Sequence, residues 1–297
     1  MLTDPIDLKF TVSSPARLKL DNVSGSVVVQ AAEEDEIHIF AVKRQGTGDF
    51  DHTKIECTQA EDGTVFAATK MPDLPFSILG GYKICEVDYL VKVPVNTAAE
   101  IKVVSSDVKI TGTSGDLNIK CVSGDVQLES ISGNINIDSV SGDIVGKELS
   151  DSLLAKTVSG DVNLVNSNLG QLKFYSTSGD LAVEAALGDG PHQFKTVSGD
   201  VILKLNGKSD AEVILKTLSG TLRTDFPVQK QNYSQGRQSV VIGQGKSQVS
   251  MSSVSGDLRI VSTGEKPEKP SANISDIISR IDNGELTVEQ ALEQLSG

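Results

Sequence analysis

Apolar and polar residues alternate over short stretches of this chain, and the tripeptide Ser-Gly-Asp interrupts the alternation at regular intervals. Residues 122–128 read VSGDVQL, with apolar residues in the first, fifth and seventh positions, and residues 131–137, ISGNINI, repeat that arrangement. A period of two places alternate side chains on one face of a β-strand. Glycine tolerates positive φ, and aspartate or serine can bond nearby backbone amides. The pattern predicts short strands joined at Ser-Gly-Asp corners.

The corners recur with a short and nearly constant period. The serines of the strongest copies, from Ser105 to Ser219, follow one another at steps of 18, 18, 18, 19, 20 and 21 residues, and a weaker series lies between them. The growing step predicts wider coils or longer loops toward the C-terminus. The residues to which we assign a structural corner role are Ser123, Gly124, Asp125, Ser141, Gly142, Asp143, Ser159, Gly160, Asp161, Ser178, Gly179, Asp180, Ser198, Gly199 and Asp200.

Strands and corners alternate without an intervening helical pattern, which favours a chain that coils. Coils stacked at about 4.8 Å pair in parallel and enclose valine, isoleucine and leucine side chains. We therefore predict an all-β fold, a single-stranded parallel β-solenoid (β-helix) with 18–21 residues per coil. Parallel crossovers are generally right-handed, so we expect a right-handed coil.

The composition divides the chain into four parts. Residues 1–100 contain a first coil at 16–30 and longer irregular strands, which we interpret as a cap that protects the open end of the solenoid. Residues 101–262 form the regular solenoid. Residues 263–273 are rich in proline and charge, which is typical of a linker. Residues 274–297 predict a short α-helical hairpin.

The hairpin is predicted from two apolar stripes with helical spacing that are separated by Gly284. So few residues cannot bury a core alone, so the stripes must bind a partner protein or a second copy of the chain. Docking on the solenoid's own end is the alternative. The residues that we expect to bind the partner are Ile274, Ile277, Ile278, Ile281, Val288, Ala291, Leu292 and Leu295.

Three features resemble a known bacterial family: the repeated VSGDV nonapeptides, the strand entry VPV at 93–95 and the closing VSGDLRI at 254–260. They are similar to the domain-of-unknown-function family labelled "putative adhesin", over residues 16–262. The resemblance implies a single-stranded β-solenoid and implies no catalytic residues. The C-terminal sequence IISRIDNGELTVEQALEQL resembles the short SHOCT-like helical hairpins attached to such solenoids, for which it implies an interaction or oligomerisation role.

The charge of the chain argues against two classes of partner. Its net charge of −13 disfavours nucleic acid, and it contains no polybasic segment for anionic lipid. The N-terminal sequence has no basic region followed by an apolar one, and no apolar stretch approaches the roughly 18 residues of a membrane-spanning helix. We therefore expect a cytoplasmic protein without a transmembrane segment and without a nucleic-acid partner.

No catalytic or metal-binding pattern is recognisable, and we predict no catalytic residues, no cofactor and no metal. The aspartates of the corners fall in one file, which could bind calcium, but the preferred interpretation is that they accept bonds from corner amides. The cysteines and histidines lie in unrelated segments without ligand spacing: Cys57, Cys85, Cys121, His38, His52 and His192.

These observations favour a non-enzymatic interaction scaffold, a rigid solenoid with a C-terminal protein-interaction or oligomerisation module. One alternative is a surface or glycan-binding adhesin. A second is a carbohydrate-active β-helix enzyme, because elongated β-helices can place carboxylates beside a glycan. The chain has no tryptophan and only 4% aromatic residues, so it lacks the stacking platforms that sugars favour.

Overall fold

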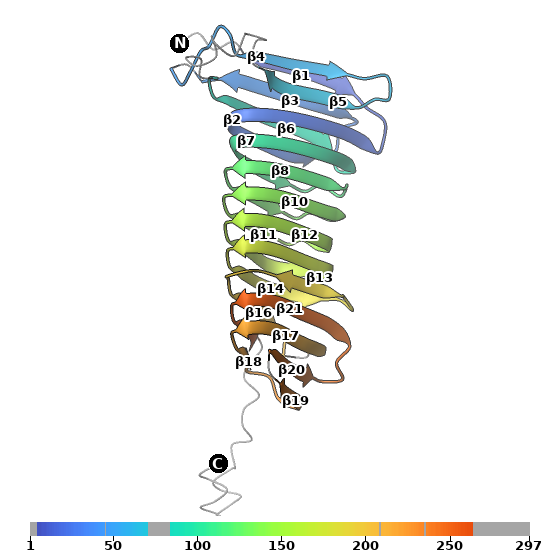
Figure 1. Cartoon of the computed structure of the whole chain (residues 1–297). Coiled ribbons are helices and arrows are strands. Elements are labelled where there is room, and N and C mark those ends of the chain that lie inside the picture. Colours follow the sequence, from blue (N-terminus) through green and yellow to red (C-terminus); the bar gives the residue numbers. More distant parts are fainter. Residues whose placement is uncertain (1–4, 45, 71–83, 208, 235, 264–297) are drawn as a thin grey trace, which may run out of the picture.

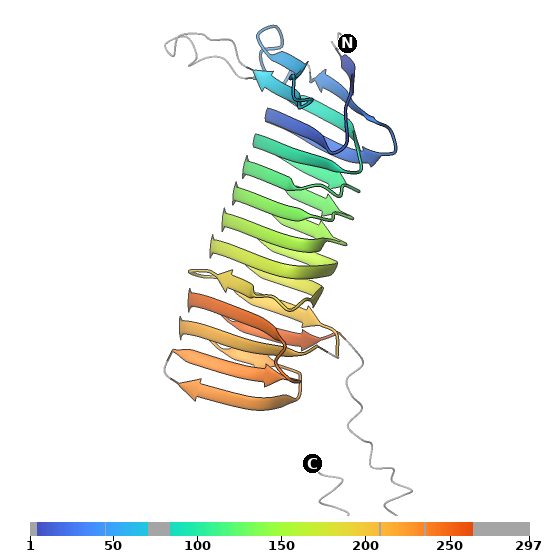
Figure 2. The same cartoon turned by 90° about the vertical axis from the view of Figure 1, so that its right-hand side faces the viewer.

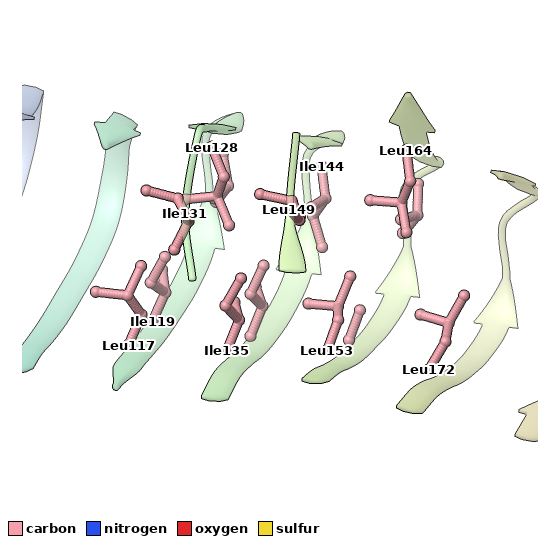
Figure 3. Packing of buried hydrophobic residues seen from close by; sticks show 14 of the residues in the cluster. Leu117, Ile119, Leu128, Ile131, Ile135, Ile144, Leu149, Leu153, Leu164 and Leu172 are labelled. Carbon is pink, nitrogen blue, oxygen red and sulfur yellow. The ribbon is translucent and has the colours of Figure 1, made fainter. Parts of the chain in front are cut away.

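The computed structural model describes residues 5–44, 46–70, 84–207, 209–234 and 236–263, which form one sheet of 22 strands. The strands are stacked into an elongated column that ends in antiparallel strands (Figure 1, Figure 2). Apolar side chains at alternate positions fill the interior. In Figure 3, Leu117, Ile135, Leu153 and Leu172 follow one another up the column, each at most 2% exposed. Within the described residues, no helix is long and apolar enough to cross a membrane.

In the middle of the column, consecutive coils follow sequence order. Ser105 pairs with Ser123, Ser123 with Ser141 and Ser141 with Ser159, so each coil lies in parallel on the coil 18 residues before it. The strands of this region are β7 (Thr97–Thr111), β8 (Leu117–Ser123), β9 (Val126–Glu129), β10 (Asn134–Ser141), β11 (Ile144–Lys147), β12 (Ser150–Ser159), β13 (Val162–Ser178) and β14 (Leu181–Leu187).

At the N-terminal end the order changes. Strand β2, the first coil of the chain, pairs in parallel with β7 on one side and with β5 and β6 on the other. Antiparallel pairs of β1 with β3, β3 with β6 and β4 with β5 complete this end. The strands are β1 (Ile6–Thr11), β2 (Ala16–Ala32), β3 (Glu36–Lys43), β4 (Lys54–Gln59), β5 (Val65–Lys70) and β6 (Val87–Pro94).

The C-terminal end contains an inserted coil. Strands β21 and β22, the last of the described chain, lie between the coil of β15 and β16 and the coil of β17 and β18, and pair in parallel with both. Antiparallel strands β19 and β20 follow β17. The strands are β15 (His192–Lys195), β16 (Val201–Leu205), β17 (Ala211–Ser219), β18 (Leu222–Thr224), β19 (Val228–Ser234), β20 (Arg237–Ile242), β21 (Ser247–Ser255) and β22 (Leu258–Ser262).

The predicted fold class, a uniform parallel β-solenoid with a C-terminal helical hairpin, is therefore wrong. The described residues contain strands and no α-helix, and the strands at both ends pair in antiparallel because an open edge of parallel strands would leave backbone groups unpaired. The inference of progressively wider coils is also wrong. Ser198 pairs with Ser255 and Ser255 with Ser219, so the step of 21 residues does not join neighbouring coils.

Several predictions concern the C-terminal part of the chain, where residues 264–297 lie outside the described residues. These are nearly all of the linker and the whole predicted hairpin. The eight apolar residues expected to bind a partner, from Ile274 to Leu295, fall in the same range. A partner-binding surface must therefore be sought on the described strands.

Candidate functional site

The Ser-Gly-Asp tripeptides lie where each coil bends from one strand to the next. Gly124 has a φ of 133°, and a Cβ atom on it would lie 2.2 Å from the backbone oxygen of Ser106 in the adjacent coil. The same approach recurs at Gly142, whose Cβ would lie 2.1 Å from the oxygen of Gly124. Real Cβ atoms do not approach a carbonyl so closely, so these corners stack only because the residue is glycine.

The corner aspartates form a ladder of hydrogen bonds between coils. The backbone N–H of Asp125 donates to Oδ1 of Asp107 at 3.0 Å. The bond recurs at 2.8 to 2.9 Å for Asp143, Asp161, Asp180, Asp200 and Asp257, each of which donates to the aspartate of the adjacent coil. One oxygen of each accepting carboxylate is thus held by a backbone amide. In the described part of the chain, no group of three or more His, Cys, Asp and Glu side chains could hold a metal ion.

A row of half-exposed valines runs beside this edge, one residue before each corner serine. Their side chains are 46% to 51% exposed, and Thr177 takes the corresponding place in one coil. Leu218, at the C-terminal end of the row, is 86% exposed. We call the row the valine ladder; its members are Val104, Val122, Val140, Val158, Val197 and Val254.

Sequence reasoning missed the valine ladder. It grouped Val122 with Val126 as apolar positions of one half-turn, but Val126 is buried and Val122 is exposed, because the corner interrupts the alternation between them. Counting from the preceding strand finds the difference: Leu117, Ile119 and Cys121 all point inward, so the next residue points outward. In the weaker series of corners, Ile131 at the same motif position is buried.

A second column of side chains accompanies the valine ladder, two residues earlier in each coil. Its members pair with one another across neighbouring strands and include five lysines and two aspartates. We call it the lysine column. From the N-terminal end it consists of Asp21, Lys102, Lys120, Asp138, Lys156, Tyr175, Lys195, Ser252 and Lys216.

The members of the lysine column differ in their ionic partners. Lys102 lies 2.7 Å from Glu100, whose carboxylate raises the pKa of the lysine, and Lys156 lies 3.2 Å from Asp138. Lys120, between these pairs, forms no ion pair with any described residue. The column therefore presents a positive charge beside the valines on a protein whose net charge is −13.

A groove of about 430 Å³ separates the valine ladder from the lysine column near the N-terminal end. Valines form one wall, the column forms the other, and a row of largely buried residues forms the floor. The lining residues are Val23, Val104, Val122 and Val140 on the first wall, Asp21, Lys102, Lys120 and Asp138 on the second, Asn22, Val103 and Cys121 on the floor, and Thr69 beside Asn22.

A buried network fixes the floor of the groove at its N-terminal end. The amide nitrogen of Asn22 donates to the backbone oxygen of Val87 at 2.9 Å and to Oγ of Ser106 at 3.2 Å. The hydroxyl of Thr69 donates to Oδ1 of Asn22 at 2.9 Å and lies 2.9 Å from the hydroxyl of Tyr89. Burial raises the pKa of Tyr89. The groove is therefore built on a side-chain network that three different segments supply.

The histidines occupy separate positions. His192 is buried, where Nδ1 accepts the backbone N–H of Leu172 at 3.2 Å and Nε2 donates to the oxygen of Gly188 at 3.1 Å, and burial lowers its pKa. His38 lies 2.6 Å from Asp7, and His52 lies 2.9 Å from Asp49. The histidines thus do not converge on a common site.

The cysteines are likewise separate and free of disulfides. Cys85 and Cys121 are buried, and Cys57 is partly buried. Burial raises the pKa of both Cys57 and Cys121 to about 11, which disfavours the reactive thiolate at neutral pH.

Comparison with known proteins places the chain among bacterial relatives. The sequence model of the Toastrack family, DUF4097, matches residues 15–261. No curated protein matches. Among solved structures, a "putative adhesin" from Parabacteroides distasonis ATCC 8503 is 14% identical, with 86% of this chain and 97% of that chain covered and a TM-score of 0.43. A "putative adhesin" from Bacteroides fragilis NCTC 9343 is 12% identical over the same shares, with a TM-score of 0.38.

Proposed function

Because the chain belongs to the Toastrack family DUF4097, a domain of unknown function, we propose a role from its own surface: a non-enzymatic scaffold that binds a protein along the valine ladder. The observation that carries this proposal is the row of half-exposed valines beside a groove of about 430 Å³. Single exposed apolar residues are ordinary on a protein surface, but a contiguous row marks a site of interaction.

The location of the ladder supports a binding role. The valines sit on strands whose registers are set by parallel pairing on both sides, so their spacing is fixed before any partner arrives. A partner that contacts several rungs would lose little entropy in ordering this surface, because the scaffold is already rigid. Each valine side chain that becomes buried contributes further to the free energy of association.

The chemistry of the polar side chains supports a non-enzymatic role. The file of corner aspartates, the most regular set of carboxylates, uses an oxygen of each accepting residue to hold the next coil. His192 uses both ring nitrogens to bond the backbone. These groups stabilise the column rather than face a common substrate.

The test is a pull-down from the organism's own lysate with the full chain and with Val122→Lys/Val140→Lys. The matched control is Gln127→Lys/Val145→Lys, which changes two exposed residues on the strands that follow the same corners. We expect the ladder variant to lose a protein that the control retains, with equal melting temperatures. Retention of the same proteins by both variants would contradict the proposal.

A further inference from the structure

We propose that the occupant of the groove is an amphipathic helix of a partner protein. Its apolar stripe would lie on the valine ladder and its acidic flank would face the lysine column. This inference rests on the proposed function and specifies the partner's chemistry. Three properties of the groove lead to it: its direction, its charge and its shape.

The direction of the groove favours a helix over an extended segment. The valines lie on neighbouring strands, so the ladder runs across the strands and repeats at about 4.8 Å. A helix presents an apolar residue once per turn, at about 5.4 Å, whereas an extended chain presents one every two residues, at roughly 6.6 Å. Over the four valines of the groove, a helix departs from the ladder by only about 2 Å in total.

The charge of the lysine column selects an acidic flank. The column contains five lysines and two aspartates, and Asp138 is already held by Lys156 at 3.2 Å. Lys120, on the wall of the groove, forms no ion pair with any described residue. An acidic side chain of the partner would pair with it, while a basic flank would be repelled. A second copy of this chain, with its net charge of −13, is disfavoured by overall repulsion.

The shape of the groove suits one helix. The valine and lysine walls are separated by a single residue in each coil, Val103 in one and Cys121 in the next. The aliphatic stems of the lysines add apolar surface to the second wall while their ammonium groups stay in solvent. A stripe about one side chain wide, bounded by charge, is the complement of an amphipathic helix that lies lengthwise in a groove.

The test uses a defined probe, a fluorescent alanine-rich helical peptide of about 18 residues with one leucine stripe and glutamates on its flanks. The control peptide carries lysine in place of every glutamate. We expect the full chain to bind the acidic peptide at least tenfold more tightly in fluorescence anisotropy, despite the net negative charge of both molecules. Lys120→Glu/Lys156→Glu should weaken that binding at least tenfold, and raised salt should weaken it further. Gln127→Glu, beyond the corner, should leave it unchanged.

Each other outcome overturns the inference. Equal binding of the two peptides, or no effect of Lys120→Glu/Lys156→Glu, would contradict the charge selection. Absence of peptide binding, combined with loss of a captured protein in Val122→Lys/Val140→Lys, would leave the proposed function standing and exclude the helix. A chain ending at residue 263 that binds the acidic peptide much more tightly would show that the chain's own C-terminal residues fill the groove. A doubled mass in light scattering that Val122→Lys/Val140→Lys abolishes would show a second copy there.

Discussion

The middle of the column and its two ends are built from the same kind of coil but are connected differently. In the middle, each coil lies on the coil 18 residues before it. At the C-terminal end, the N–H of Asp257 bonds to Asp200, 57 residues earlier, and at the N-terminal end Ser24 pairs with Ser105. The repeat thus determines the conformation of each coil, while the order of coils at the ends depends on which edges need cover.

This difference has an energetic side. Repeat proteins with neighbours in sequence order behave as a chain of nearest-neighbour interactions, so a defect in one repeat acts mainly on the repeats beside it. At the ends of this column, neighbours in space are distant in sequence. A defect there must act on segments that the sequence order would place far apart.

The largest effect is expected for Gly124→Val, in the middle of the column. Its Cβ would lie 2.2 Å from the oxygen of Ser106, and the residue has a φ of 133°. We expect a loss of stability on the order of 4 kcal/mol, from backbone strain and the forced separation of two coils. The measurement is urea unfolding followed by circular dichroism.

Gly63→Val, near the N-terminal end, is the matched control for Gly124→Val. Gly63 has a φ of 80°, but nothing lies within 4 Å of its Cβ position. It carries the strain without the collision and should cost clearly less. Equal losses in the two variants would show that strain alone, and not the stacking of corners, requires glycine.

The next effect compares Leu258→Ala in the inserted coil with Leu164→Ala in the middle. Both side chains are fully buried, so each variant should lose about 3 kcal/mol through the cavity that it leaves. Hydrogen exchange should separate them. Leu164→Ala should loosen β11 and β14, whereas Leu258→Ala should loosen both β16 and β18, which flank the inserted coil. Exchange confined to β22 in the second variant would contradict the bridging role of that coil.

A smaller effect is expected from pH at the C-terminal end. Burial lowers the pKa of His192 below its ordinary value of 6.5, so the unfolded chain takes up a proton more readily than the folded protein. The stability due to His192 is therefore complete above pH 6.5 and is lost as the pH falls below that value. Urea unfolding at pH 7.5 and 5.5 should show a larger decline for the natural chain than for His192→Gln.

The control for the pH measurement is His52→Gln, which changes an exposed histidine. It should preserve the decline of the natural chain. A decline of equal size in His192→Gln would assign the pH dependence to other groups.

The smallest effect is expected for the aspartate ladder. Asp161→Ala removes the acceptor for the N–H of Asp180 and should cost about 1 kcal/mol, while Asp161→Asn keeps an oxygen there and should cost less. Thermal melts of both variants provide the measurement. We also expect millimolar calcium to leave the melting temperature of the natural chain unchanged. A rise of many degrees that a chelator reverses would show a calcium site on this edge.

Local alternation predicted much of the interior. Val126, Leu128, Ile135 and Ile137 are buried as their spacing indicates, because burial in a stacked strand has a period of two. The order of coils at the ends could not be predicted, because the copies at Ser198, Ser219 and Ser255 are equivalent in sequence. Their arrangement depends on the antiparallel strands that cover the end of the column.

The candidate site was harder to find than the interior. A valine before a serine is read as a core residue when it is counted together with the strand that follows it. The bend at Ser-Gly-Asp reverses the side on which the next residues point, and alternation alone does not reveal a bend. The charge beside the ladder was also hidden, because its lysines come from separate coils and no segment of the sequence is basic.

The inserted coil also has a consequence for the protein while it is being synthesised. Residues 192–205 and 211–224 leave the ribosome before residues 247–262, yet the described structure joins these two coils only through that later segment. Until translation passes residue 262, each coil has an unpaired edge of parallel backbone groups, which is a template for pairing with another chain. A prematurely terminated chain would therefore have two adhesive edges, and its aggregation would depend on where translation stopped.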